Sequence, residues 1–128
     1  MIEQITKGIK ITVGTSFDGK RYQNLRMYYA FSYAITIENQ SSDTVQLISR
    51  HWNIYDSLSD VETVDGEGVV GEKPIIAPKQ SYTYNSHCLL SSAIGAMNGH
   101  YNVVNFSSSK QFKVVIPTFH LTIPSNLN

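Results

Sequence analysis

Three glycines near the middle of the chain have the spacing of a nucleotide-binding loop. Gly66, Gly68 and Gly71 match G-x-G-x-x-G, which in dinucleotide-binding proteins joins a strand to a helix whose N-terminus holds the pyrophosphate. Here Pro74 and Pro78 follow the glycines, and proline interrupts the helix that the phosphate needs. The pattern therefore favours a structural loop that uses the backbone freedom of glycine, and phosphate or pyrophosphate binding by this loop is the alternative hypothesis.

Carboxylates surround the same glycines and would repel a phosphate. Residues 60–72 contain five acids and no Lys or Arg. Carboxylate oxygens also suit Mg²⁺ or Ca²⁺, but the spacing matches no EF-hand loop, so we expect a solvated acidic surface and no metal site. The acids are Asp60, Glu62, Asp65, Glu67 and Glu72.

A second conspicuous run is Arg50-His51-Trp52. On a strand, Arg50 and Trp52 share one face while His51 points to the other. We expect Trp52 in the interior and Arg50 at the mouth of the core, stacked on an aromatic ring or paired with a carboxylate. The alternative is an exposed Arg50/Trp52 recognition patch, because both residue types are frequent at binding hot spots.

Nucleophilic catalysis has weak support in this sequence. His87 and Cys88 are adjacent, so on a strand they point to opposite faces and do not share a proton. The other histidines have no metal-binding spacing, and neither a nucleophile elbow nor a P-loop motif is present. We therefore expect no enzyme, no catalytic residue, no metal and no cofactor.

Length and composition indicate one folded domain, 1–128. The chain has 128 residues, of which 41% are hydrophobic, and only 16% are charged. Ten basic and ten acidic side chains leave no net charge, so we expect neither nucleic-acid binding nor attraction to an anionic membrane. A single cysteine fits a reducing compartment. Without a leader or a long apolar stretch, the sequence predicts a cytoplasmic location and no membrane insertion.

Hydrophobic residues alternate with a period of two along most of the chain, which predicts strands and no long helix. Asp18-Gly19 predicts a turn after the first strand, and residues 91–98 predict a loop or at most one helical turn. Seven or eight short strands indicate an immunoglobulin-like or fibronectin type III-like sandwich of two antiparallel sheets. The expected strands are 9–13, 29–39, 45–55, 61–64, 81–86, 98–106, 111–116 and 118–123. The expected core contains Tyr33, Ile35, Ile37, Trp52, Phe119 and Leu121.

Several segments together resemble the ApaG family, whose bacterial members are also called CorD. The similar segments are Arg50-His51-Trp52, the glycine segment through Pro78, the aromatic strand from Tyr29 to Asn39, Gly95 to Tyr101, and Ile116 to Leu121. The resemblance implies a fibronectin type III-like β-sandwich without an established catalytic mechanism. It also implies a protein-interaction role and a link to cobalt and magnesium resistance or efflux.

These observations predict a non-enzymatic binding module with a protein partner, and a phosphate or nucleotide ligand as the alternative. The candidate ligand-binding residues are Arg50, Trp52, Gly66, Gly68 and Gly71.

Overall fold

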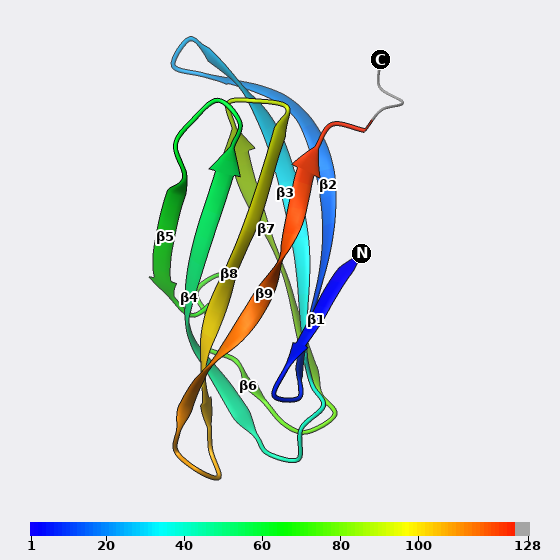
Figure 1. Ribbon diagram of the computed structural model, residues 1–128, viewed down its shortest axis with the longest axis vertical. Helices are drawn as coiled ribbons and strands as arrows, with labels where there is room; N and C mark the ends of the chain where they lie inside the picture. The colour runs from blue at the N-terminus through cyan, green and yellow to red at the C-terminus, as the bar shows by residue number, and fades with distance from the viewer. Residues whose placement is uncertain (125–128) are drawn as a thin grey trace.

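The chain is built entirely from strands, turns and loops in the computed structural model, which describes residues 1–124 (Figure 1). This confirms the predicted all-β class; the last four residues of the predicted domain lie outside the described part. Within the described residues there is no helix long and apolar enough to cross a membrane. The strands are β1 (Ile2–Thr6), β2 (Ile9–Gln23), β3 (Arg26–Asn39), β4 (Val45–Asp56), β5 (Glu62–Glu67), β6 (Ile75–Ile76), β7 (Ser81–Leu90), β8 (Ile94–Asn105) and β9 (Gln111–Thr122).

Two antiparallel sheets face each other, as the sandwich prediction requires. Sheet A has the order β1-β2-β3-β7, and sheet B has the order β5-β4-β8-β9, with the short β6 paired to β4. Strand β1 also lies beside β9, where the Val115 N–H donates to Thr6 Oγ1 at 3.2 Å (Figure 1). One side of the sandwich is thereby nearly closed, while β7 and β5 end the two sheets on the other side.

The core lies between the sheets and is formed by the alternate residues that period-two patterning places inward. All six predicted core residues belong to it. At its centre the Trp52 ring makes edge contacts with Tyr33 and Phe119, with ring centroids 5.5 and 5.8 Å apart. Edge-to-face packing of this kind stabilises aromatic clusters beyond their area of contact.

The N-terminal part differs from the predicted boundaries. Strand β1 was not predicted, and the predicted turn at Asp18-Gly19 is wrong, because β2 continues through it as a bulge between Phe17 and Gly19. The turn lies at Asn24-Leu25, where φ is 50° and 66°. These positive angles suit a two-residue hairpin whose twist matches its strands, and pairing with β3 extends the hairpin past the glycine.

The C-terminal part also differs in two places. Strand β8 begins at Ile94, so the predicted loop over 91–98 is wrong: Gly95 and Ala96 are small, but they pair with β4 on one side and β9 on the other. Strand β9 is continuous through Pro117, which lies at a bulge opposite the β8 segment between Met97 and Gly99. An edge strand accepts proline at a bulge because no ladder hydrogen bond is lost there.

Candidate functional site

Arg50 points toward the interior because of a bulge in β4. Leu47 pairs with Val103 and Ser49 pairs with Asn102, so Ile48 is an extra residue in the ladder. Beyond the bulge the alternation restarts one residue later. Arg50 and Trp52 therefore share the inner face, as predicted.

The guanidinium of Arg50 is held by backbone carbonyls. Its Nη1 donates to the carbonyl oxygen of Glu67 at 3.0 Å and to that of Gly68 at 2.9 Å. The expected alternatives, a carboxylate partner or an aromatic stack, are both wrong: no ion pair or cation–π contact of the described residues includes Arg50. Two carbonyl oxygens carry only partial charge, and no carboxylate of the described residues forms an ion pair with Arg50, although Asp65 and Glu67 line a second hollow that Arg50 borders.

Gly66 makes room for this guanidinium. Gly66 pairs with Arg50 across the β4–β5 ladder, and a Cβ at position 66 would lie 2.7 Å from Arg50 Cζ. A side chain at position 66 would press on the guanidinium, which is the flexible end of Arg50 and would have to shift relative to its carbonyl partners. Gly66, the first glycine of the G-x-G-x-x-G motif, therefore has a steric role: it leaves space for the Arg50 guanidinium.

A cavity of about 190 Å³ opens beside Arg50 at the mouth between the two sheets. Both free edges contribute to it, through Ser86 and His87 of β7 and through Val64 of β5. Five of its eight lining residues are aromatic or aliphatic, and Arg50, Ser86 and His87 supply polar groups. Sequence reasoning missed Tyr33, Ile54, Val64, Ser86, His87 and Met97 as lining residues of this cavity.

Trp52 is a core residue and is only 3% exposed. The structure therefore gives it the position that the core interpretation expects, and Arg50 alone reaches the mouth. An exposed patch formed jointly by Arg50 and Trp52 is absent from the described surface. Trp52 contributes to the site as a wall of the cavity.

The glycine loop is a compact turn whose backbone amides are mostly occupied. The Gly68 N–H donates to Ile48 O at 2.8 Å, and Val69 and Glu72 exchange two backbone hydrogen bonds. Between them, Val70 and Gly71 have φ values of 47° and 79°, as in a type I′ turn. The segment continues to Pro74 and β6 without a helix. This geometry favours the structural interpretation of the loop, since an anion would find few free N–H groups there.

Buried hydroxyl and thiol groups lie behind the mouth. Tyr84 and Tyr101 share a hydrogen bond between their hydroxyls, and burial raises the pKa of both phenols. Burial also raises the pKa of Tyr33, against the effects of Ser86 and the Arg50 charge. The pKa of the Cys88 thiol is raised to about 11 by burial, with the charges of Glu62 and Asp56 adding to it. These groups are neutral at physiological pH, so they do not balance the Arg50 charge.

The outer face of sheet B carries a separate polar network. His51 Nδ1 donates to Asp65 Oδ1 at 2.6 Å, and the rings of His51 and His100 stack with centroids 5.1 Å apart. The hydrogen bond to Asp65 raises the pKa of His51, whereas burial lowers the pKa of His100, as do the charges of Lys113 and His51. Among the described residues, no group of three His, Cys, Asp or Glu side chains could hold a metal ion.

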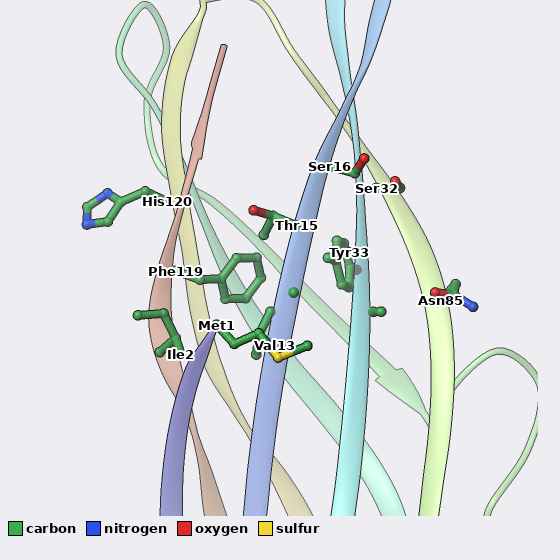
Figure 2. Close-up of a pocket in the computed structure, with 12 residues that line it drawn as sticks. Met1, Ile2, Val13, Thr15, Ser16, Ser32, Tyr33, Asn85, Phe119 and His120 are labelled. Carbon is green, nitrogen blue, oxygen red and sulfur yellow. The ribbon is translucent and has the colours of Figure 1, made fainter. Parts of the chain in front are cut away.

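A larger pocket of about 630 Å³ lies near the N-terminus of the chain (Figure 2). Apolar side chains such as Met1, Val13 and Phe119 and hydroxyls such as Thr15 line it. Its one imidazole, His120, points away from the other labelled side chains in Figure 2. Within residues 1–124, no Asp, Glu, Lys or Arg side chain lines this pocket, so its side chains are less specific for a charged ligand than those of the Arg50 cavity.

Three of the four sheet edges have features that prevent another strand from pairing with them. Strand β1 has 5 residues and lies against β9. Strand β9 has a bulge at Pro117 and an exposed lysine, Lys113. Strand β5 has 6 residues, three of which are acidic. Short length, charge, proline and bulges all discourage strand addition.

Strand β7 is the exception. It runs for 10 residues, Ser81–Leu90, without an Asp, Glu, Lys, Arg, proline or glycine. Its register with β3 is regular along its whole length, and no described strand pairs with its other edge. A long, straight edge that lacks such charges is a template for an additional strand.

The backbone groups that face this free edge follow from the alternation of β3. Asn39 bonds with Lys79 and Gln80 through both its C=O and its N–H, so the odd-numbered residues of β3 are directed toward β7. In the register of β3 and β7, Tyr33 pairs with Ser86. The N–H and C=O groups of the odd-numbered residues of β7, including Asn85 and His87, therefore point to the free edge.

Comparisons with known proteins agree with the fold. The model of the ApaG domain matches residues 19–105 of this chain. The curated Protein ApaG of Brucella canis is 40% identical over 124 residues, which are 97% of this chain and 95% of that protein. Protein ApaG of Bradyrhizobium diazoefficiens is 40% identical over 126 residues, covering 98% and 96% of the two chains.

Solved structures give the same result. An X-ray structure from a structural genomics consortium superposes with a TM-score of 0.87 at 36% identity and covers 94% of this chain and 90% of that chain. A crystal structure of a Bordetella pertussis protein described as ApaA has a TM-score of 0.77 at 34% identity and covers 94% and 99%. Both chains are therefore similar to this one in sequence as well as in fold.

Proposed function

The chain belongs to the ApaG domain family, and from this premise we propose that it is a non-catalytic module that binds an extended segment of a protein partner along β7. The observation that carries the proposal is the free edge of β7, which is 10 residues long and unbulged and has no Asp, Glu, Lys or Arg. Strand addition supplies affinity through main-chain hydrogen bonds and specificity through pockets for alternate side chains. Both requirements meet here, because the Arg50 cavity opens at this same edge.

We propose a non-catalytic role because the Cys88 thiol and the His87 imidazole lie on opposite faces of β7. Cys88 is buried and His87 is exposed, as expected for adjacent residues of one strand. A thiol whose pKa is near 11 is a weak nucleophile at neutral pH. We place the partner in the reducing cytoplasm, in keeping with a single cysteine.

The proposed role also bears on two ligands suggested by the sequence. Phosphate binding by the Gly66–Gly71 loop is the weaker candidate, since the N–H groups of Gly68 and Val69 already have backbone partners, as does that of Glu72 just after the loop. In this proposal, the link to cobalt or magnesium resistance that the family resemblance implies would act through the bound partner.

The test locates the partner on the surface. A photo-crosslinking amino acid replaces His87 on β7 or Thr122 on β9, both exposed. After affinity purification from the native cell at low and high Mg²⁺, we expect a crosslinked partner peptide from position 87 and none from 122. Equal crosslinking from both positions, or none from 87, would contradict the proposal.

A proline variant provides the matched control. Asn85→Pro removes an N–H that points to the free edge, whereas Asn85→Ala keeps it. We expect the proline variant to remain folded by circular dichroism and to lose the partner, and the alanine variant to retain it. Retention by a folded proline variant would exclude strand addition at β7.

A further inference from the structure

We infer that Arg50 selects the partner: its guanidinium receives the carboxylate of a Glu or Asp side chain from the strand added to β7. This inference rests on the proposed strand addition and specifies its chemistry. The position of the cavity supports it first. Arg50, Ser86 and His87 line one cavity, so a strand beside β7 directs alternate side chains into the space that Arg50 faces.

The hydrogen bonding of Arg50 is a second observation that favours a carboxylate ligand. Within the described chain, only Nη1 has protein partners, the carbonyls of Glu67 and Gly68. No buried side-chain nitrogen or oxygen of that part lacks a partner, so Nε and Nη2 are open to the cavity or to solvent. A guanidinium anchored at one nitrogen presents its remaining donors in a fixed plane, which matches the two oxygens of a carboxylate.

The acidic side chains near Arg50 provide a third observation, because none of those that the structure describes forms an ion pair with it. The acids that follow Arg50 along the ladder are used elsewhere: Asp65 pairs with His51, and Glu67 Oε2 lies 3.3 Å from Lys73 Nζ. Both face the outer side of sheet B, because they pair in register with His51 and Ser49. The inner face holds Glu62, which lies opposite Ile54 and forms no ion pair with Arg50.

The walls of the cavity strengthen the interaction. Trp52 and Met97 are buried, and Val64 and Ile54 complete an apolar surface around the guanidinium. Charge pairs that form beside apolar groups are screened less than those in water. A volume of about 190 Å³ accommodates one acidic side chain, with little room for a larger ligand.

The experiment uses random peptides displayed on phage, selected on the wild-type protein, on Asn85→Pro and on Arg50→Gln. We expect wild-type selection to enrich peptides with an acid at one fixed position. Asn85→Pro should enrich none, and Arg50→Gln should enrich peptides without that acid. An Arg50→Lys variant keeps the charge, and a thermal melt of each variant shows that it is folded.

Synthetic peptides then measure the effect on the unmodified protein, independently of any folding defect. We expect Glu→Gln at the enriched position to raise the Kd about ten-fold or more, as for the loss of a charge-assisted hydrogen bond. Peptides that bind β7 equally well with Glu or Gln would overturn the role of Arg50 while leaving strand addition intact. Failure to enrich any peptide that requires the β7 edge would overturn strand addition itself. Tighter binding of pyrophosphate than of the peptides, lost in Arg50→Gln, would assign the cavity to a phosphate instead.

Discussion

The guanidinium of Arg50 lies so close to the α-carbon of Gly66 that a Cβ there would be 2.7 Å from Arg50 Cζ. The backbone of β5 therefore forms one wall for the guanidinium, and the carbonyls just beyond it accept its hydrogen bonds. This contact links the glycine motif to the Arg50 cavity.

Gly66→Ala should displace Arg50 from the carbonyls of Glu67 and Gly68. Loss of hydrogen bonds from a charged group costs about 1.5–3 kcal/mol, and because Arg50 is partly exposed we expect the lower end in urea unfolding. Adding Arg50→Gln to Gly66→Ala should cost little more, since the same bonds are already lost. Additive losses in the double variant would show that Gly66 acts independently of Arg50.

The two later glycines should respond unequally to alanine. Gly68 has φ of 61°, and a Cβ there would collide with the carbonyl oxygen of Glu72, whereas Gly71 has φ of 79° with open space around it. We expect Gly71→Ala to cost about 1 kcal/mol through backbone strain alone, and Gly68→Ala to cost clearly more. Thermal melts give the order, and equal losses would contradict the steric part.

Val70→Asn should stabilise the protein. Val70 is 63% exposed and has φ of 47°, a conformation that β-branched residues avoid. With Gly71 it occupies the centre of a type I′ turn, for which Asn-Gly is preferred. We expect a gain of roughly 0.5–1 kcal/mol in the free energy of unfolding. Val70→Thr keeps the branched side chain and should give no comparable gain.

Cys88 should be unreactive while the protein is folded. The side chain is 8% exposed, and burial raises its pKa to about 11, so little thiolate is present at neutral pH. A thiol reagent such as iodoacetamide should modify it only in denaturant. Modification in buffer at the rate of a free cysteine would show that β7 opens readily.

His51 and His100 should titrate in opposite directions from their ordinary pKa of 6.5. The pKa of His51 is raised, so its protonation stabilises the fold at pH below that ordinary value, and this contribution is lost as pH rises through the folded pKa. The pKa of His100 is lowered, so it opposes folding as pH falls toward and below its ordinary value. Proton NMR titration measures both, and Asp65→Asn should lower the pKa of His51. An unchanged His51 titration in that variant would contradict the assigned cause.

The period-two alternation of side chains predicts which faces of the strands are buried. Trp52, Tyr33 and Phe119 were assigned to one core, and they are buried together. The sequence also places Arg50 and Trp52 on one face and favours glycine backbone freedom in the loop; both residues line one cavity, and Gly68 and Gly71 have positive φ. Each depends on local alternation or on glycine geometry, which neighbouring residues determine.

Strand ends and bulges were beyond such reasoning. The predicted turn at Asp18-Gly19 is wrong because this segment pairs with β3. The predicted loop over 91–98 is wrong because β8 pairs with β4 and β9 from Ile94 on. In both places strand pairing outweighs the local turn preference. A bulge such as that at Ile48 depends on the register between β4 and β8, which are far apart in the chain. The local sequence around Ile48 does not determine that register.

The sequence by itself determined an all-β chain, its buried faces and the ApaG resemblance, because side-chain period and residue type are properties of the chain alone. Only the tertiary structure decided that Arg50 is bound to carbonyls rather than a carboxylate, that Gly66 makes room for it, and that β7 ends its sheet without protection. These relationships join residues of different strands. They exist only once the free energy of pairing and core packing has fixed which strands are neighbours.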